Sequence, residues 1–129
     1  MPFVRIDVPS HFTESRTHAV AEAVHNSLVK TFNVPQDDRF QALQRHAAGE
    51  VVIAPSYMGI AHGRDAILVQ ITCSEGRPIP VKKALFAAIA DSVSQAGDLP
   101  PADIIINLVE TKKENWSFGN GIAQYATDD

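Results

Sequence analysis

The second residue of the chain is the one whose type and position could carry chemistry. Pro2 directly follows the initiator methionine. That methionine is removed when the next residue is small, so we expect the mature chain to begin with the secondary amine of Pro2. An α-amino group has a reference pKa of about 7.7–8.0, so burial or a neighbouring charge can make it an acid or a base at pH 7. Such an amine can also attack a carbonyl to form an iminium ion. The alternative is a rigid start to a strand.

Other residues that could do chemistry form weaker patterns. His18 and His25 are not at the i, i+4 spacing of a helical zinc pair, and His11, His46 and His62 are scattered, so we expect no metal site. The segment 119–121 lacks the third glycine and the strand-to-helix setting of a dinucleotide loop, so no cofactor is expected. Cys73 closes an apolar strand and is predicted to be a core residue rather than a nucleophile.

Composition and charge exclude several classes of protein. The chain has 129 residues, of which 45% are hydrophobic and 20% charged, which predicts a single domain over 1–129. The net charge of −4, with scattered Lys and Arg, argues against a nucleic-acid partner. The chain has neither a signal-like start nor an apolar run of about 18 residues, which argues against export and membrane insertion. A single cysteine favours the cytoplasm.

The first half of the chain predicts a strand, a helix and a second strand. Apolar and polar residues alternate over 3–8, as in a half-buried strand. A helix over about 13–32 has apolar residues every three or four positions, with Ser10 or Thr13 as its cap. Pro35 ends this helix, because proline cannot donate the next helical hydrogen bond. A strand over about 39–46 follows.

The second half repeats this order. It predicts a strand over 67–73, a helix over about 78–96 and a strand over 104–109. Between the halves, the apolar run 51–53 and its glycine-containing continuation predict a connecting strand and loop. After Glu110 the aromatic and glycine residues of 111–129 are typical of a hairpin or an arm.

A constant spacing relates the two halves. A shift of 65 residues takes Pro35 to Pro100 and also superimposes the pairs Val4 and Val69, Ile6 and Ile71, Ala23 and Ala88, Ser27 and Ser92, and Asp38 and Asp103. We interpret the regions 2–46 and 67–110 as two copies of one β-α-β unit; two unrelated units with similar helix stops are the alternative. The fold class is therefore α/β, with one mixed sheet and both helices on one face. The opposite sheet face is also apolar, so another subunit is expected to cover it.

Several stretches of the chain resemble one known family. They are PFVRIDV at the start, VPQDDRFQ after the first helix, GIAHGRDAILVQIT with SEGRPIPVKKALFAAI, and ENWSFGNGIAQYAT near the end. Together with Pro2 and the doubled β-α-β plan, they resemble the tautomerase superfamily, and more narrowly the malonate semialdehyde decarboxylase group. The resemblance covers nearly the whole chain. It implies a homotrimer whose active sites lie near the subunit boundaries.

The resemblance also assigns roles to particular residues. Pro2 would be the catalytic amine, and Asp38 the acid that supports its protonated state. Arg77 would grip the substrate carboxylate, while Trp116 and Phe118 would form the apolar wall of the pocket. Each has a plainer interpretation: a turn residue for Asp38, a solvated charge for Arg77 and interface core for Trp116.

The chain departs from the family pattern at one point. Some decarboxylases of this group carry Arg-x-Arg after the strand, whereas this chain has Ser74-Glu75-Gly76-Arg77 and so a single arginine. Arg64 or Arg39 would have to supply a second positive charge.

The resemblance implies a cofactor-independent enzyme that acts on a small carboxylate-bearing carbonyl compound. Decarboxylation of a 3-oxo acid such as malonate semialdehyde is the first hypothesis. The alternatives are keto–enol tautomerisation of a phenylpyruvate-like 2-oxo acid, and hydration or dehalogenation of a three-carbon acrylate. A non-catalytic trimeric binding protein is the hypothesis from another class.

Overall fold

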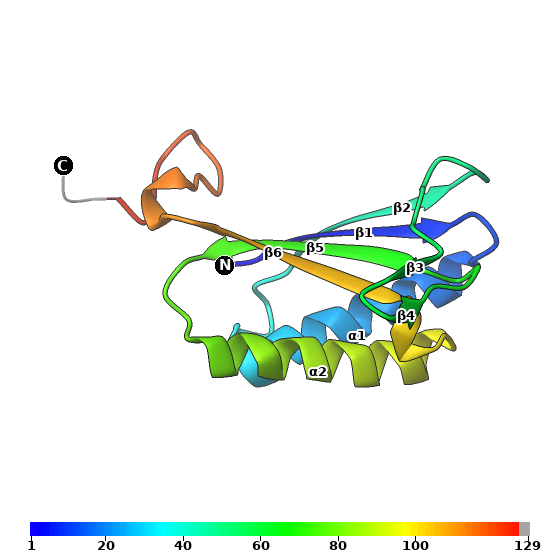
Figure 1. Cartoon of the computed structure of the whole chain (residues 1–129). Helices are drawn as coiled ribbons and strands as arrows, with labels where there is room; N and C mark the ends of the chain where they lie inside the picture. Colours follow the sequence, from blue (N-terminus) through cyan, green and yellow to red (C-terminus); the bar gives the residue numbers. More distant parts are fainter. Residues whose placement is uncertain (127–129) are drawn as a thin grey trace.

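The chain folds into one four-stranded sheet with two long helices on one face. A computed structural model describes residues 1–126; the end of the predicted arm, 127–129, lies outside the described residues. The strand order is β2-β1-β5-β6, and Figure 1 shows α1 and α2 side by side beneath the sheet. The elements are β1 (Phe3–Pro9), α1 (Glu14–Phe32), β2 (Phe40–His46), β5 (Ile67–Ser74), α2 (Ile79–Gly97) and β6 (Ile104–Thr111). Each predicted helix and strand of the two repeats is confirmed to within two residues.

The connection between the repeats differs from the prediction. The apolar run 51–53 forms no strand, and Val52 is 87% exposed. The short strands are instead β3 (Ser56–Tyr57) and β4 (Ile60–Ala61), which pair only with each other. Met58 and Gly59 both have positive φ, at 50° and 78°, which suits the two-residue loop of a tight hairpin. The turn therefore decides where strands form, and apolar character alone does not.

The sheet has the pairing expected of two β-α-β units. Within each unit the strands are parallel, β1 with β2 and β5 with β6, whereas β1 and β5 are antiparallel. Arg5 of β1 lies opposite Gln70 of β5, which is its own counterpart under the shift of 65 residues. A pseudo-twofold axis therefore passes through this pair. It relates the two ends of the sheet to each other.

The helices meet on the same axis. Ser27 Oγ and Ser92 Oγ lie 2.9 Å apart, and each also lies within hydrogen-bond distance of the carbonyl four residues earlier in its own helix. One hydroxyl proton can serve the Oγ–Oγ hydrogen bond while the other serves a helix carbonyl. Small, internally satisfied side chains let α1 and α2 approach closely. The core lies between these helices and the sheet, and its fully buried members include Ile6, Val24 and Ile89.

The helix ends follow local rules that the sequence contains. Thr13 accepts a hydrogen bond from the backbone N–H of Arg16 at 3.0 Å, so Thr13 rather than Ser10 caps α1. Asn33 and Asp98, 65 residues apart, follow the last residues of α1 and α2 in the left-handed conformation, at φ 56° and 54°. Two further short turns are 3-10 helices, Pro101–Asp103 and Lys113–Asn115.

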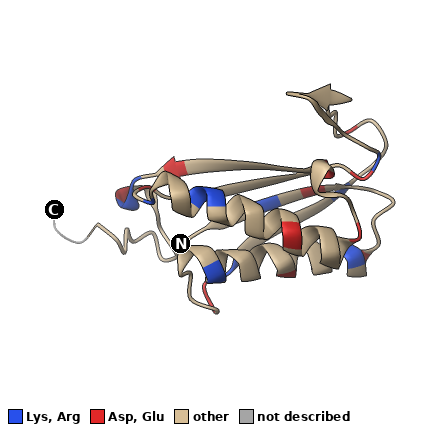
Figure 2. Ribbon diagram, turned by 60° about the horizontal axis from the view of Figure 1, so that its bottom comes forward, with Lys and Arg blue, Asp and Glu red and all other residues tan. Residues whose placement is uncertain are grey.

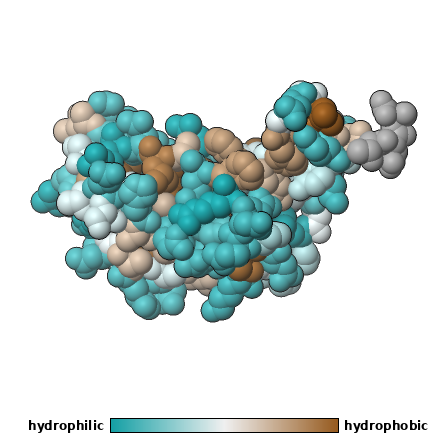
Figure 3. All heavy atoms as spheres, turned by 180° about the vertical axis from the view of Figure 1, so that it is seen from behind, coloured by the Kyte–Doolittle hydropathy of each residue, from teal (hydrophilic) through white to brown (hydrophobic). Residues whose placement is uncertain are grey.

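The surface is polar on the helix side and partly apolar on the sheet side. Figure 2 shows basic and acidic residues interspersed over the helices rather than gathered by sign. Figure 3 shows apolar residues interrupting the hydrophilic surface along the upper side of the molecule. Large exposed apolar residues include Phe3, Phe40, Tyr57, Met58 and Val109. Coverage of this face by another subunit stays a prediction.

Within residues 1–126, no helix has the length and apolar character needed to cross a membrane.

Candidate active site

The N-terminus lies at one end of the sheet, beside the C-terminal arm (Figure 1). Pro2 is buried immediately before β1, and the ammonium nitrogen of Met1 is 3.9 Å from Asp38 Oδ2. The Met1 side chain is itself almost entirely buried. Removal of Met1 would therefore open a space at this end of the sheet and place the new Pro2 amine close to the carboxylate.

Asp38 is held by the turn that follows α1. Its backbone N–H donates to Pro35 O at 3.0 Å, and Pro35 directly follows the segment that ends the helix. The carboxylate oxygen Oδ1 is buried and has no hydrogen-bond partner among the described residues. A buried carboxylate oxygen without a donor is costly, so it has capacity for a ligand, a water molecule or the mature N-terminus. The functional role of Asp38 stays a prediction, for which this unpartnered oxygen supplies the capacity.

Arg77 is anchored to two different elements. It follows Gly76, whose φ of 122° requires a residue without a side chain. Its Nη1 donates to Ser74 O and its Nη2 to Phe32 O, each at 3.3 Å, and its guanidinium carbon lies 4.2 Å from the centre of the Phe32 ring. These contacts fix the plane of the guanidinium at the end of β5, so Arg77 is a positioned cation rather than a solvated one.

The pKa of the Cys73 thiol depends on the charged groups at this end of the sheet. Burial raises the pKa of its thiol, and Glu110 adds to the rise, whereas Arg77, the N-terminus and Lys82 oppose it. The thiol is therefore neutral and 2% exposed, as expected of a core residue. Lys82 Nζ and Glu110 Oε1 form an ion pair of 2.6 Å at the same end.

The aromatic residues of the arm stack above the edge of the sheet. Trp116 and Phe118 have ring centres 5.8 Å apart, and Phe118 also contacts Phe40 and Tyr125, at 6.3 and 5.1 Å. The indole Nε1–H donates to Thr111 Oγ1 at 2.8 Å, which ties the arm to the end of β6. The arm thus contributes three rings to a cluster of four aromatic rings, the fourth being Phe40 of β2, and is tied to β6 by the indole hydrogen bond.

Sequence reasoning missed several contributors to this end of the molecule. Ser74, the last residue of β5, has a buried hydroxyl without a hydrogen-bond partner among the described residues. Phe32 supplies the ring under Arg77, while Phe40 and Tyr125 extend the aromatic cluster. Only contacts between distant segments reveal these roles, and no local sequence signal marks them.

Of the two candidates for a second positive charge, Arg39 is already paired with a carboxylate and Arg64 lies at the other end of the sheet. Arg39 forms an ion pair with Glu22, whose pKa it lowers by a hydrogen bond and by its charge, and its Nε donates to Gln41. Arg64 lines a cavity of about 410 Å³ at the opposite end of the sheet. Of these three arginines, Arg77 lies just after β5 and, with the N-terminus, contributes to the charges around Cys73.

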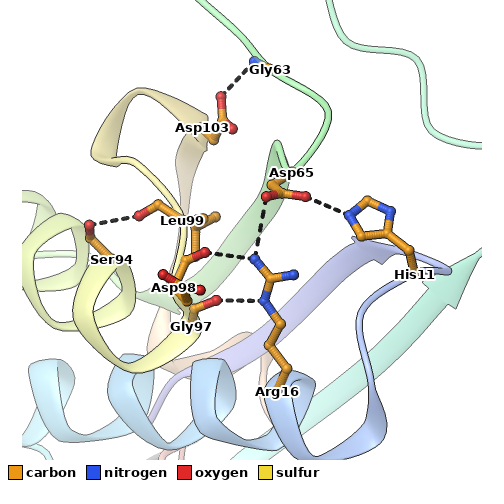
Figure 4. A network of polar contacts seen from close by, with 9 residues as sticks. All are labelled: His11, Arg16, Gly63, Asp65, Ser94, Gly97, Asp98, Leu99 and Asp103. Atoms are coloured by element: carbon orange, nitrogen blue, oxygen red, sulfur yellow. Dashed lines mark hydrogen bonds and ion pairs between the residues drawn. The ribbon is translucent and has the colours of Figure 1, made fainter.

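The opposite end of the sheet shows how an arginine anchored in this way can hold a carboxylate (Figure 4). Arg16 donates to Gly97 O at 2.6 Å and to Asp98 O at 2.8 Å, and its guanidinium lies 3.7 Å from the centre of the Phe12 ring. Gly97 is the counterpart of Phe32 under the shift of 65 residues. The same guanidinium still reaches Asp65 Oδ2, at 3.5 Å. An arginine that is bonded to a helix end and stacked on a phenylalanine thus keeps the capacity to pair with an anion.

Comparison with known proteins shows the family to which the chain is related. Two family models, both described as tautomerase enzyme, match residues 38–119 and 2–60. The probable tautomerase YusQ of Bacillus subtilis (strain 168) is 32% identical over 124 residues, which are 96% of this chain and 98% of that protein.

Two solved structures show how far the similarity extends. FG41 malonate semialdehyde decarboxylase, inhibited by 3-bromopropiolate, is 33% identical with a TM-score of 0.90, over 97% of this chain and 95% of that chain. A fused 4-OT described as a symmetric trimer is 23% identical with a TM-score of 0.79, over 97% and 98%. The second likeness concerns the fold alone.

Proposed function

We propose that this chain, which belongs to the tautomerase family of enzymes, is a cofactor-independent decarboxylase of a small 3-oxo acid such as malonate semialdehyde. The observation that supports the proposal is the position of the N-terminus, 3.9 Å from Asp38 Oδ2, at the end of the sheet where Arg77 is anchored just after β5. The likeness to FG41 malonate semialdehyde decarboxylase supports the same substrate class.

In this proposal the mature Pro2 nitrogen is the reacting amine. The Asp38 carboxylate, 3.9 Å from the present N-terminus, favours the protonated form of an amine placed there. A protonated amine beside the substrate carbonyl stabilises the negative charge that develops on the carbonyl oxygen. The bond to the carboxylate carbon breaks, carbon dioxide leaves with its two oxygens, and the electron pair forms the enolate of acetaldehyde. Protonation of the enolate carbon completes the reaction.

The covalent alternative uses the neutral Pro2 amine. The amine attacks the aldehyde carbon, water leaves, and the iminium ion accepts the electron pair as carbon dioxide departs. Protonation of the resulting enamine and hydrolysis release acetaldehyde and restore the amine. The charge of Pro2 at neutral pH separates the two routes, and NMR titration of the Pro2 nitrogen measures it.

Arg77 binds the substrate carboxylate in either route. Its anchors at Ser74 O and Phe32 O leave Nε and the remaining N–H bonds for a ligand, and two parallel hydrogen bonds to a carboxylate fix its orientation. Trp116 and Phe118 supply an apolar wall, and an apolar surrounding favours the loss of the carboxylate charge. The arm lies on the side of the sheet that the helices leave uncovered (Figure 1). We therefore propose that the other subunits of a homotrimer cover it and complete the pocket.

A keto–enol tautomerase is the second candidate, and the similarity to a probable tautomerase favours it. A neutral Pro2 would then remove a proton next to the carbonyl of a phenylpyruvate-like 2-oxo acid. Hydration or dehalogenation of a three-carbon acrylate uses the same residues. A trimer that binds without turnover is the remaining alternative, and it predicts that Pro2→Ala changes no reaction.

Proton NMR of malonate semialdehyde incubated with mature protein tests the proposal, after intact mass has verified that Met1 is absent. We expect acetaldehyde to form with the wild type. It should be lost with Pro2→Ala, which still permits removal of Met1 but leaves a primary amine, and should be much reduced with Arg77→Ala. A wild-type preparation without turnover of malonate semialdehyde would refute the decarboxylase. Enolisation of phenylpyruvate by that preparation would then support the tautomerase.

A further inference from the structure

A cavity of about 410 Å³ lies at the end of the sheet opposite Met1. Three loops form it: the loop after β1 at Pro9–His11, the loop after β2 at His46–Ile53, and the segment before β5 at Gly63–Ala66. Its volume lies within the range of roughly 300–1,000 Å³ found for small-molecule sites.

The pseudo-twofold axis makes this cavity the counterpart of the candidate active site. Residues lining it lie 65 positions before residues at the other end: Pro9, His46, Val51 and Ile53 correspond to Ser74, Thr111, Trp116 and Phe118. Valine and isoleucine are smaller than the tryptophan and phenylalanine they correspond to. The cavity is therefore open in this chain, whereas the Met1 side chain is buried at the other end.

The cavity lacks the group on which the proposed reaction depends. The counterpart of Pro2 is Ile67, and its nitrogen is part of the peptide bond that follows Ala66. An amide nitrogen is neither basic nor nucleophilic, so the amine chemistry cannot take place here. Binding without turnover is the role that this position allows.

Two histidines face the cavity, and an aspartate holds each of them. His11 Nε2 lies 2.5 Å from Asp65 Oδ1, and His46 Nε2 lies 2.7 Å from Asp7 Oδ1. Figure 4 shows the first pair, with Arg16 contacting Asp65 from the other side. The hydrogen bond from His11 and the charge of Arg16 lower the pKa of Asp65 despite its partial burial, so this carboxylate stays charged and fixes the ring. Each imidazole is thereby oriented through its own Nε2 atom.

The third polar group is Arg64, which is exposed at the cavity. Within residues 1–126 its guanidinium has no hydrogen-bond or ion-pair partner, whereas Asp65 and Asp7 already have partners. One acid faces the same region, because Glu50 Oε2 lies 3.8 Å from His46 Nδ1. The planar fork of the Arg64 guanidinium matches a carboxylate. Each imidazole uses its Nε2 toward an aspartate, so its Nδ1 adds a second donor to an oxyanion only in the imidazolium form of the ring. The described residues hold no group of three or more metal-binding side chains.

We propose that this cavity is a second, non-catalytic binding site for a small carboxylate, held by Arg64 with His11 and His46. The site is independent of the amine chemistry at Pro2. It would give each chain one reacting pocket and one binding pocket, related by the internal symmetry of the fold.

Histidine-ring NMR of the full chain in an Arg77→Ala background, which disables the carboxylate contact of the first pocket, tests the proposal. Malonate and inorganic phosphate are titrated separately up to about 20 mM, a range that covers the millimolar affinity of a small anion. We expect saturable shifts of the His11 and His46 signals with malonate. Adding Arg64→Gln should weaken malonate binding by about tenfold, the loss of roughly one charge-assisted hydrogen bond.

Arg45→Gln is the matched control, because Arg45 is an exposed arginine beside His46 that does not line this cavity. It should leave the malonate titration unchanged. Shifts that do not saturate, equal affinity in the Arg64→Gln variant, or phosphate binding as tight as that of malonate would each overturn the proposal. Failure of the decarboxylase assay leaves this titration unaffected, so the two proposals can fail separately.

Discussion

Replacing Arg77 and Arg16 by alanine in separate variants distinguishes a substrate contact from a structural one. Both arginines bind a helix-end carbonyl and stack on a phenylalanine, at 4.2 Å for Arg77 and 3.7 Å for Arg16. Arg77→Ala removes one cation–π contact and two hydrogen bonds, and Arg16→Ala removes one cation–π contact, two hydrogen bonds to carbonyls and a 3.5 Å contact with Asp65. We expect each to lower the free energy of unfolding by about 1–2 kcal/mol.

The two variants should differ in activity. In our proposal only Arg77 contacts the substrate carboxylate, through two charge-assisted hydrogen bonds that together contribute about 3–4 kcal/mol when allowance is made for non-additivity. At 1.36 kcal/mol per factor of ten, Arg77→Ala should lower kcat/KM about 10²–10³-fold. Arg16→Ala should change kcat/KM by less than about threefold, because its anion partner is Asp65 of the same chain.

The assay combines urea unfolding of both variants with initial rates of acetaldehyde formation by the mature proteins. Equal losses of activity in the two variants would show that Arg77 acts through stability alone. A kcat/KM for Arg77→Ala within about threefold of the wild type would refute the carboxylate contact. Arg77→Lys adds a further check, since lysine keeps the charge but lacks the planar fork and should recover only part of the activity.

Three other predictions follow from single contacts. Asp38→Asn should lower kcat/KM by at least about tenfold, as measured by initial rates. It should leave the unfolding free energy, measured in urea, within about 1 kcal/mol of the wild type, because Oδ1 has no partner among residues 1–126. Gly97→Ala should destabilise the fold by about 1–2 kcal/mol in urea unfolding, because the new Cβ would lie 2.7 Å from Val20 Cγ2. Asp65→Asn should cost about 1 kcal/mol at pH 7. The hydrogen bond from His11 lowers the pKa of Asp65 below its ordinary 3.8, so the stabilisation is fully present above pH 3.8 and is lost as the pH falls below that value. Urea unfolding should therefore show the free energies of the wild type and Asp65→Asn converging at lower pH.

The secondary structure could be predicted because local signals and tertiary packing agree. Thr13 caps α1, and the turn before Pro35 ends it, as the sequence indicates. The shift of 65 residues also placed Ser27 and Ser92 in equivalent positions, and their hydroxyls meet at 2.9 Å on the pseudo-twofold axis. The strand expected at 51–53 was wrong because an apolar run without a neighbouring strand has no partner for its backbone hydrogen bonds.

The candidate site was less accessible to sequence reasoning. The chemistry of a terminal secondary amine drew attention to Pro2, but its proposed catalytic role, like those of Asp38 and Arg77, entered through the family resemblance, since no spacing along the chain relates the three. Their neighbours could not be predicted at all. The unpartnered hydroxyl of Ser74 and the Phe32 ring under Arg77 depend on where separate elements end, which only the assembled fold determines.

Chain connectivity explains why a nearly symmetric fold would use its two ends differently. The axis through Arg5 and Gln70 places equivalent strand ends at Pro2 and Ile67. One continuous chain has one free N-terminus, so after removal of Met1 only the first end can present an amine. At the second end the preceding residues remain attached, and one of them, Asp65, provides the carboxylate that pairs with Arg16. In our proposal the carboxylate that pairs with the arginine at the Pro2 end comes from the substrate, whereas at the Ile67 end it comes from the protein itself. Arg77 takes the substrate carboxylate in this proposal because, among residues 1–126, its hydrogen bonds go to the carbonyls of Ser74 and Phe32.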